Sequence, residues 1–245
     1  MLANLLYSTS LHRELLVQLG QYDVYGLSEV APVNTRRYLL AVRDAHGIPY
    51  DSFVSVTGGS DRLLMIYSKQ RLELLDSQEL EAHNGVRMNS AGFRHRSPLV
   101  GHFRDMHSGA EFLVVLVHLA RGNADVRIEQ AKGLRLWAAD QDLPVVGIGD
   151  FNFDYDFATG QGNAAFDEFL VGDVWEWVQP EELIDTQWSD RDGADAYPDG
   201  CLDFAFVAGA AKAWQCNSRV TVRDGDFPDD ETTSDHRPVE LTVVP

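Results

Sequence analysis

A strand-like stretch that ends on an acid and an amide is the part of this sequence best suited to chemistry. Residues 143–152 read Leu-Pro-Val-Val-Gly-Ile-Gly-Asp-Phe-Asn, an apolar pattern that reaches Asp150 and Asn152. Side chains two apart in extended chain point the same way, so this carboxylate and carboxamide can meet one cation or one phosphate. The preceding glycines let the backbone bend and a ligand approach. The alternative is a capped turn, because Asp and Asn are ordinary turn residues after a strand.

Other polar side chains also stand at the ends of expected strands. They are Asn4, Glu29, His118, Asp203 and the neighbours Asp235 and His236. If one rim of a sheet gathers them, their hard oxygen ligands suit Mg²⁺, Mn²⁺ or Ca²⁺ better than zinc. Several carboxylates in one pocket also require either a cation or widely separated pKa values. Taken singly, each acid is an ordinary turn or N-cap residue, and each histidine an ordinary core or turn residue.

The elements that would position these groups alternate between strands and helices. We expect strands near 2–7, 23–29, 53–57, 63–67, 71–75, 97–102, 111–118, 145–152, 202–207, 219–222 and 239–243. We expect helices near 11–19, 34–46, 124–140 and 163–170. The segments 63–67 and 71–75 should form an antiparallel pair, and 185–199 a surface loop. Helices alternating with strands and hairpins predict an α/β protein with mixed sheets.

Length and composition bound the remaining possibilities. The 245 residues contain no internal repeat and no linker-like stretch, which predicts a single domain over 1–245. The formal charge of −18 opposes long-range attraction of a polyanion unless arginines or a bound metal reverse the local potential; it is also compatible with a high-salt habitat. Cys201 and Cys216 form neither a zinc pattern nor a disulfide framework, although one bridge between them stays open. We find no signal peptide and no membrane-spanning run, and expect a cytoplasmic monomer without an obligate protein partner or membrane insertion; secretion stays open.

Taken together, these residues resemble the endonuclease/exonuclease/phosphatase, or DNase I-like, superfamily. The most specific pieces are Gly-Asp-Phe-Asn at 149–152 and Ser-Asp-His-Arg-Pro at 234–238, and the resemblance spans Asn4 to Pro238. Val-His-Leu at 117–119, with Arg127 and Gln130 on the following helix, supports it. The resemblance implies a four-layered α/β sandwich: two mixed, largely antiparallel β-sheets flanked by helices.

The resemblance also implies a metal side and a reacting side of the site. Glu29 is similar to the family's metal-binding glutamate, Asn4 to a residue that assists the metal or a phosphate oxygen, and Asp235 to a second metal contact. Ser28 departs from the family pattern, because many members carry glutamine before this acid.

On the reacting side, Asp150 and Asn152 resemble the pair that positions the attacking water and the scissile phosphate. His236 resembles a general base or a phosphate-binding imidazole, oriented by Asp203. His118 resembles the histidine that stabilises the transition state or protonates the leaving oxygen.

Three further residues lie outside these two groups. Asp61 and Arg62 resemble the family's acid-arginine pair, in which the acid orients the histidine at position 118. Arg96 resembles an arginine that reaches a flanking phosphate, and Arg94 competes with it for this role.

The implied activity is hydrolysis of phosphodiesters with Mg²⁺, or with Mn²⁺ or Ca²⁺, most often in DNA as an endonuclease or end-processing nuclease. The alternative is a phosphatase or phosphodiesterase acting on a lipid, sugar or other small-molecule phosphate, which the net acidity favours because few basic residues are available to follow a phosphate backbone. A catalytically idle family member that binds a partner is a third reading. The complete set of acids and histidines argues against it.

Overall fold

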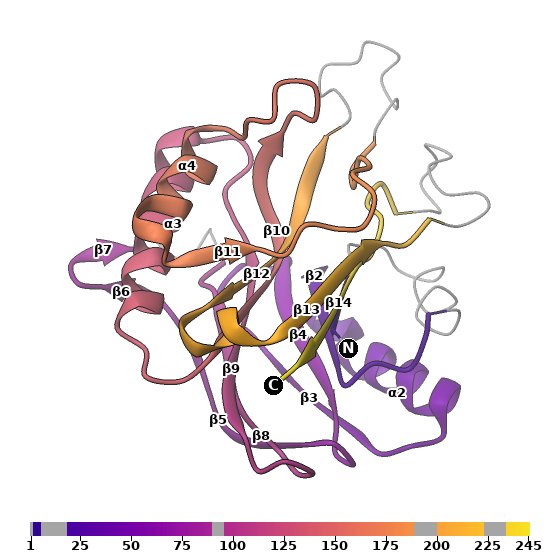
Figure 1. Cartoon of the computed structure of the whole chain (residues 1–245). Helices are drawn as coiled ribbons and strands as arrows, with labels where there is room; N and C mark the ends of the chain where they lie inside the picture. Colours follow the sequence, from indigo (N-terminus) through magenta and orange to yellow (C-terminus); the bar gives the residue numbers. More distant parts are fainter. Residues whose placement is uncertain (1, 6–18, 90–95, 189–199, 223–233) are drawn as a thin grey trace.

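Two six-stranded β-sheets form the centre of the protein in the computed structural model (Figure 1). The structure describes residues 2–5, 19–89, 96–188, 200–222 and 234–245. The strands of the first sheet, sheet A, are β1 (Leu2–Leu5), β2 (Val24–Val30), β3 (Tyr50–Val54), β4 (Arg62–Ser68), β13 (Gln215–Val220) and β14 (Val239–Val244). The strands of sheet B are β5 (Leu72–Glu79), β8 (Leu99–Asp105), β9 (Glu111–His118), β10 (Val145–Tyr155), β11 (Trp175–Trp177) and β12 (Cys201–Ala208).

Each sheet is mixed and mainly antiparallel. Sheet A runs β13-β14-β1-β2-β4-β3 and sheet B runs β11-β12-β10-β9-β8-β5. One pair in each sheet is parallel, β1 with β2 and β9 with β10, and the other neighbours are antiparallel. A short ribbon of β6 (Ala82–His83) and β7 (Val86–Arg87) lies outside both sheets. The parallel pair β9 and β10 matters for function, because it carries two of the expected site residues at adjacent strand ends.

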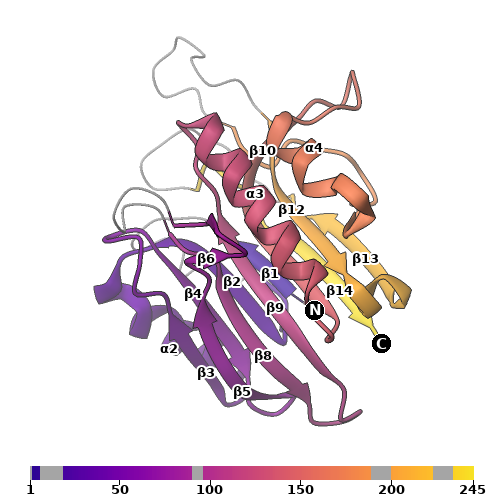
Figure 2. The same ribbon diagram turned by 90° about the vertical axis from the view of Figure 1, so that its left-hand side faces the viewer.

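The sheets pack face to face and helices cover their outer faces. Apolar residues from both sheets, such as Met65 and Leu116, form a shared core between them. The helix α2 (Thr35–His46) covers sheet A, while α3 (Ala124–Ala139) and α4 (Ala164–Leu170) cover sheet B. Figure 1 shows α3 and α4 on the side opposite α2, and Figure 2 shows α3 lying along sheet B. This is the four-layered α/β sandwich that the sequence predicts, so the predicted fold class is confirmed.

Local sequence explains where the helices begin and end. The side chain of Asn123 accepts a hydrogen bond from the N–H of Val126 at the start of α3, and Asn163 caps α4 in the same way. The helix α2 ends at Gly47, whose φ of 66° is the left-handed conformation that glycine adopts at low cost. Three short 3₁₀ helices complete the described elements: η1 (Pro32–Asn34), η2 (Val171–Asp173) and η3 (Gly209–Ala213). No helix in the described part of the chain is both long and apolar enough to span a membrane.

Several expectations about the elements are wrong. The segments 63–67 and 71–75 do not pair, because β4 already has β2 and β3 as neighbours and the chain crosses to the edge of sheet B as β5. The strand expected at 53–57 is β3 at Tyr50–Val54, since Ser55 bends the chain by donating its hydroxyl to the carbonyl of Thr57. The segment 185–199 is not wholly a surface loop, because residues 186 and 187 are buried.

Other expectations meet the described residues only in part. The expected helix at 11–19 lies outside the described residues except for residue 19, and 189–199 also lies outside them. Both cysteines are free thiols, so no bridge joins them.

Candidate active site

Three adjacent strands of sheet B bring three of the expected side chains to one level. Asp150 on β10 is paired with His118 on β9 and with Asp203 on β12. Residues paired directly across neighbouring strands project from the same face of a sheet. All three are buried, with at most 7% of their surface exposed. Sheet pairing alone therefore assembles an acid, a second acid and an imidazole at the ends of these strands.

His236 completes this cluster from the segment before β14. Its Nδ1 lies 2.7 Å from Oδ2 of Asp203, a hydrogen bond between two buried groups. Burial by itself lowers the pKa of His236, but the charge and hydrogen bond of Asp203, with the charges of Asp150 and Asp235, outweigh burial and raise it to about 9. The imidazole is thus held as a cation at neutral pH, with its Nε2 turned away from Asp203.

Asp150 is the acid at the centre of the cluster. Burial raises its pKa to about 7, and the nearby Asp203 carboxylate adds to the rise, while His236 opposes it. His118 Nε2 lies 3.4 Å from Oδ2 of Asp150. The other carboxylate oxygen, Oδ1, accepts the backbone N–H of Asn152 at 2.9 Å. A carboxyl group with a pKa near neutrality can exchange a proton with water at physiological pH.

Asn152 projects from a bulge at the end of this strand. The pairing of β10 with β12 shifts between Asp150 and Tyr155, and Asn152 has a φ of 51°, in the left-handed region. Its Nδ2 donates to the carbonyl oxygen of Leu119 at 3.0 Å. One N–H of the amide and its oxygen remain for a ligand. The bulge therefore aims the amide, which simple alternation along a strand would not fix.

The glycine before Asp150 is required by a close backbone contact. Gly149 has a φ of 134°, and a Cβ at this position would lie 2.1 Å from the carbonyl oxygen of Val117. No other residue fits this approach without moving β9 away from β10. Glycine thus permits the tight strand pairing that places Asp150 beside His118.

Glu29 approaches the same cluster from sheet A. It lies in a bulge of β2, where the pairing with β4 shifts between Leu27 and Val30, and its φ is 56°. Its Oε1 is 3.8 Å from His118 Nε2, so Glu29 reaches across from one sheet to the other. Burial raises the pKa of this carboxyl; Arg96 opposes the rise. Ser28, which departs from the family pattern, is buried, and its hydroxyl has no hydrogen-bond partner within the described ranges of the chain.

His118 is kept neutral by its surroundings. Burial lowers its pKa well below the ordinary range, and the positive charges of Arg96 and His236 add to the effect. Its Nδ1 is buried, and no described residue forms a hydrogen bond with it. A neutral imidazole in this position can donate or accept a hydrogen bond but carries no charge.

The expected pairing of Asp61 with His118 is wrong for the described residues. Asp61 instead lies 3.9 Å from Arg96 and also accepts from the hydroxyl of Ser60. About half of its side-chain surface is exposed, so the carboxylate sits at the edge of the cluster. Arg62 likewise does not join the cluster, because it donates to the carbonyl oxygens of Gly59 and Ser55 and braces the turn there.

Arg96 lies near the acids of the cluster and interacts with their charges. Burial lowers its pKa, whereas the charges of Glu29, Asp61 and Asp150 raise it, and its Nε has no hydrogen-bond partner among the described residues. Arg94, its competitor for phosphate contact, lies outside the described residues.

The structure gives fewer contacts for Asn4 and Asp235, the other two expected metal contacts. Asn4 is paired with Gly26 on β2 and with Val239 on β14, but its side chain lies outside what the structure describes. Asp235 precedes His236, and its charge acts on both Glu29 and His236. Its backbone carbonyl accepts the N–H of Trp188.

Two buried residues of the site were missed by sequence reasoning. The Thr186 hydroxyl accepts the backbone N–H groups of Leu202 and Asp203, at 2.9 and 3.0 Å, and so holds the start of β12. The backbone of Gln187 forms isolated antiparallel β-bridges with His236 and with Gly200. Their only sequence signal is that Thr186 and Gln187 interrupt an acidic, turn-rich stretch, which does not distinguish a buried polar residue from a loop residue.

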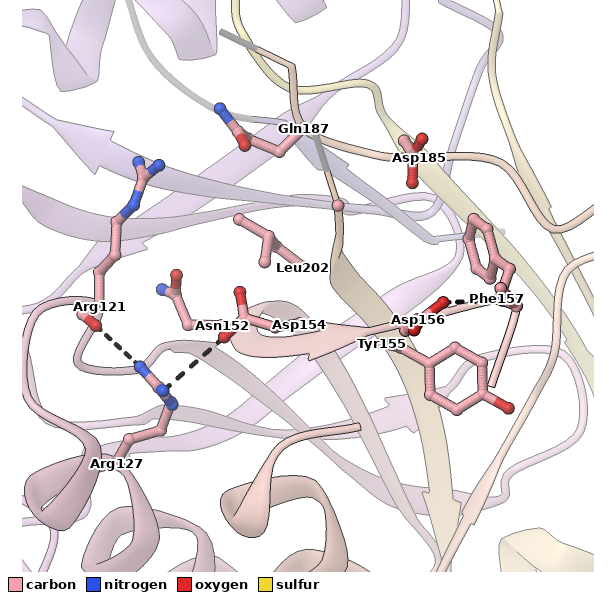
Figure 3. Close-up of a pocket in the computed structure, with 12 residues that line it drawn as sticks. Arg121, Arg127, Asn152, Asp154, Tyr155, Asp156, Phe157, Asp185, Gln187 and Leu202 are labelled. Carbon is pink, nitrogen blue, oxygen red and sulfur yellow. Dashed lines mark hydrogen bonds and ion pairs between the residues drawn. The ribbon is translucent and has the colours of Figure 1, made fainter. Parts of the chain in front are cut away.

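A cavity of about 600 Å³ opens beside Asn152 (Figure 3). Half of its described lining residues come from the end of β10 and the segment that follows it, and the others come from the start of α3 and the loop before it and from the segments on either side of residues 189–199. The described residues that line it are Arg121, Arg127, Asn152, Asp154, Tyr155, Asp156, Phe157, Ala158, Asp185, Gln187, Gly200 and Leu202. A cavity of this size is typical of small-ligand sites.

Comparison with known proteins gives structural relatives. No protein-family profile and no curated protein matches the sequence. A solved endonuclease/exonuclease/phosphatase family protein from Bacteroides thetaiotaomicron matches with a TM-score of 0.71 and 17% identity, over 99% of this chain and 95% of the other. The chain has the endonuclease/exonuclease/phosphatase fold. Two other structures with this fold are each 17% identical to the chain, with a TM-score of 0.67. One is a Bacteroides thetaiotaomicron VPI-5482 mannosyl-6-phosphatase, matched over 100% of both chains. The other is D. rerio TDP2 complexed with single strand DNA product, matched over 99% of this chain and 97% of that one.

The residues around Glu29 fit a hard divalent cation within this endonuclease/exonuclease/phosphatase fold. Among the described residues, no group of three or more His, Cys, Asp or Glu side chains is placed to hold a metal ion by itself. Mg²⁺ commonly takes only one or two protein carboxylates and keeps waters or substrate phosphate as its other ligands. Burial raises the pKa of Glu29, and Asp61 and Asp235 add to the rise while Arg96 and His236 oppose it, so a bound cation would further stabilise the charged carboxylate.

Proposed function

We propose that this chain is a divalent-metal-dependent phosphoric ester hydrolase. The observation that supports this most directly is the buried His236–Asp203 pair, with its 2.7 Å hydrogen bond, set beside Asp150 on adjacent strands. Hydrolysis of a phosphoric ester requires an oriented water, a proton acceptor for it and stabilisation of charge on the phosphoryl oxygens. The cluster offers a group for each of these tasks.

Asp150 is suited to act on the attacking water. Its carboxyl has a pKa of about 7, so a substantial fraction is ionised at neutral pH and can accept a proton. Asn152 holds one carboxylate oxygen through its backbone N–H, which leaves the other for the water.

His236 and His118 take different roles because their charges differ. The raised pKa of His236 supports the phosphate-binding alternative over the general base, since a cationic imidazole neutralises developing negative charge. The lowered pKa of His118 supports a neutral hydrogen-bonding role rather than the donation of a proton from an imidazolium. Arg96 adds a second positive charge near the same acids.

Glu29 would hold the cation, with Asn4 and Asp235 as further candidates. When bound, Mg²⁺ or Mn²⁺ supplies Lewis-acid neutralisation of the phosphoryl oxygens.

Two substrate classes remain within this proposal. The sequence resemblance favours DNA phosphodiesters, and a structure of this fold is a TDP2 bound to single-stranded DNA product. A small-molecule phosphate is the second candidate, supported by the chain's charge of −18 and by a mannosyl-6-phosphatase among the similar structures.

A substrate panel with a point variant tests the proposal. Purified protein should hydrolyse at least one of p-nitrophenyl phosphate, bis(p-nitrophenyl) phosphate, a sugar phosphate or an oligonucleotide with Mg²⁺ or Mn²⁺, and EDTA should abolish the activity. Asp150→Asn should lower kcat by about 10²–10⁴-fold, because the amide cannot accept the proton of water. Asp167→Asn, at an exposed carboxylate on α4, is the matched control and should leave kcat unchanged. Activity that survives EDTA, or near-normal turnover by Asp150→Asn, would contradict the mechanism.

A further inference from the structure

The cavity beside Asn152 carries charge of the wrong sign for a nucleic-acid backbone. Three aspartates, at 154, 156 and 185, face two arginines among the described residues of its wall. A second phosphate group placed here would meet more acids than bases. The lining therefore favours a neutral group over a second phosphate. Asp154 already accepts from Asn163, and Asp156 from Ala158 and Thr159, but a carboxylate has lone pairs for further O–H donors such as sugar hydroxyls.

Arg127, one of the two arginines, already forms hydrogen bonds within the protein. Nη1 of Arg127 donates to the carbonyl oxygens of Ala120 and Arg121, both at 2.8 Å, and its Nη2 lies 3.8 Å from Asp154 (Figure 3). Its side chain is about 9% exposed. Arg127 thus holds the loop after β9 in place, and reaching a ligand phosphate would cost these contacts.

Gln187 points independently to a polar ligand in this cavity. It is 1% exposed, it lines the cavity, and its Nε2 has no hydrogen-bond partner in the part of the chain that the structure describes. An unsatisfied buried amide is unfavourable until a hydrogen-bond partner binds it. In Figure 3 the Gln187 side chain extends above Leu202 toward the side of the cavity where Arg121 lies. Since the backbone of Gln187 forms a β-bridge with His236, the Gln187 amide is held at a fixed position relative to the phosphate-binding end of the site.

Two aromatic side chains supply an apolar surface within the same wall. The rings of Tyr155 and Phe157 lie 6.0 Å apart, centroid to centroid, on the segment that follows Asn152. Aromatic faces flanked by carboxylates and an amide match the two kinds of surface on a sugar ring: its C–H groups pack on the aromatic faces and its hydroxyls bond to the polar groups.

We propose that this cavity binds the sugar part of a monosaccharide phosphate, whose phosphate lies at Asp150 and His236. The inference rests on the proposed phosphoric ester hydrolysis and names its substrate class. In the reaction, a P–O bond forms to water and the P–O bond to the sugar oxygen breaks. The sugar oxygen leaves with a proton, so the products are the free monosaccharide and inorganic phosphate.

Kinetics on three kinds of substrate test this inference. With Mg²⁺, the kcat/KM for at least one aldohexose 6-phosphate should exceed that for glycerol 3-phosphate and for an oligonucleotide by about tenfold or more. Gln187→Met, which keeps the length of the side chain but removes the amide, should raise KM for that hexose phosphate by roughly three- to tenfold. The fall in kcat/KM should be at least threefold larger for the hexose phosphate than for p-nitrophenyl phosphate, since p-nitrophenyl phosphate has no sugar hydroxyls to lose. Glu182→Gln, at an exposed carboxylate outside the cavity wall, is the control and should change neither value.

The outcomes separate this inference from the proposed function. Hydrolysis of p-nitrophenyl phosphate or an oligonucleotide, with hexose phosphates no better than glycerol 3-phosphate, overturns the sugar site and leaves the hydrolase proposal intact. Should no phosphoric ester be hydrolysed, the hydrolase proposal fails. Calorimetric titration of the metal-loaded protein with hexose 6-phosphate then tests whether the cavity binds the sugar. Binding that Gln187→Met weakens supports the sugar site. No binding, or binding that this variant leaves unchanged, overturns the sugar site.

Discussion

Replacing Asp203 by asparagine should remove the main source of positive charge on His236 while leaving the shape of the site nearly unchanged. The Asp203 carboxylate accepts the Nδ1–H of His236 at 2.7 Å, and both residues are buried. Burial alone lowers the pKa of His236; the Asp203 charge and hydrogen bond are the largest of the effects that raise it to about 9. In Asp203→Asn the burial remains and those two effects disappear. The pKa should then fall from about 9 to 6.5 or below, a change of roughly 3 kcal/mol at about 1.4 kcal/mol per pH unit.

Histidine ring NMR measured against pH reads this change directly. The His236 signal is assigned by its loss in His236→Gln, and the wild type and Asp203→Asn are titrated without metal. At neutral pH the variant should hold an uncharged imidazole and lose the charge that stabilises the phosphoryl oxygens. We expect kcat to fall by about 10²–10⁴-fold, the range typical of a lost partner in a buried His–Asp pair.

Stability should follow the same titration. A histidine whose folded pKa lies above its ordinary 6.5 contributes stability that is fully present below pH 6.5 and is lost as the pH rises through about 9. The difference in free energy of unfolding between wild type and Asp203→Asn should therefore shrink across this window. As a control, Asp140→Asn removes the carboxylate from the largely exposed pair of His83 and Asp140 and should have little effect on activity. An unchanged pKa of His236 in Asp203→Asn would refute the reasoning, because it would mean that the carboxylate does not set the charge of the imidazole.

Two further predictions concern residues that hold the cluster in place. Gly149→Ala should destabilise the protein by about 3 kcal/mol or more in chemical denaturation, because the new Cβ would lie 2.1 Å from the Val117 carbonyl oxygen. The control is Gly122→Ala, whose Cβ would have nothing within 4 Å and which should be close to neutral. Equal effects of the two substitutions would contradict the role of the close contact. Thr186→Val should cost about 1–3 kcal/mol of stability, because it leaves the buried N–H groups of Leu202 and Asp203 without their acceptor. It should also lower kcat more than it raises KM. Full stability with full activity would show that the hydroxyl does not position Asp203.

Patterns that span a whole element were predictable from sequence. The apolar run 111–118 becomes β9 with the predicted bounds, and the helix expected at 124–140 becomes α3 at Ala124–Ala139. The alternation of these elements was enough to predict mixed sheets covered by helices, and the family resemblance was enough to predict four layers. Such features depend on local apolar periodicity, which a sequence displays directly.

Features that depend on which strands become neighbours were not predictable. The run 71–75 has a hairpin-like distance from 63–67, yet it belongs to the other sheet, because both edges of β4 are occupied. Asp61 precedes Arg62 in the expected motif, yet its carboxylate meets Arg96, thirty-five positions further along the chain. Sequence spacing carries no information about such competition between distant partners, and it cannot tell whether a threonine in an acidic stretch is buried.

Backbone strain shows why the site departs from simple strand rules. Glu29, Asn152 and Asp154 all adopt left-handed φ values, at 56°, 51° and 45°, although none is glycine. Each such residue costs on the order of 1–3 kcal/mol and persists only where its surroundings impose it. Glu29 and Asn152 both lie where a strand pairing shifts register, so the ladder on each side holds the bulge in place. In a regular strand the side chains would alternate faces and follow the sheet. The bulge in sheet A instead brings the Glu29 carboxylate to 3.8 Å from His118, and the bulge in sheet B turns the Asn152 amide to the Leu119 carbonyl at the wall of the cavity; the stability of two packed sheets offsets the cost.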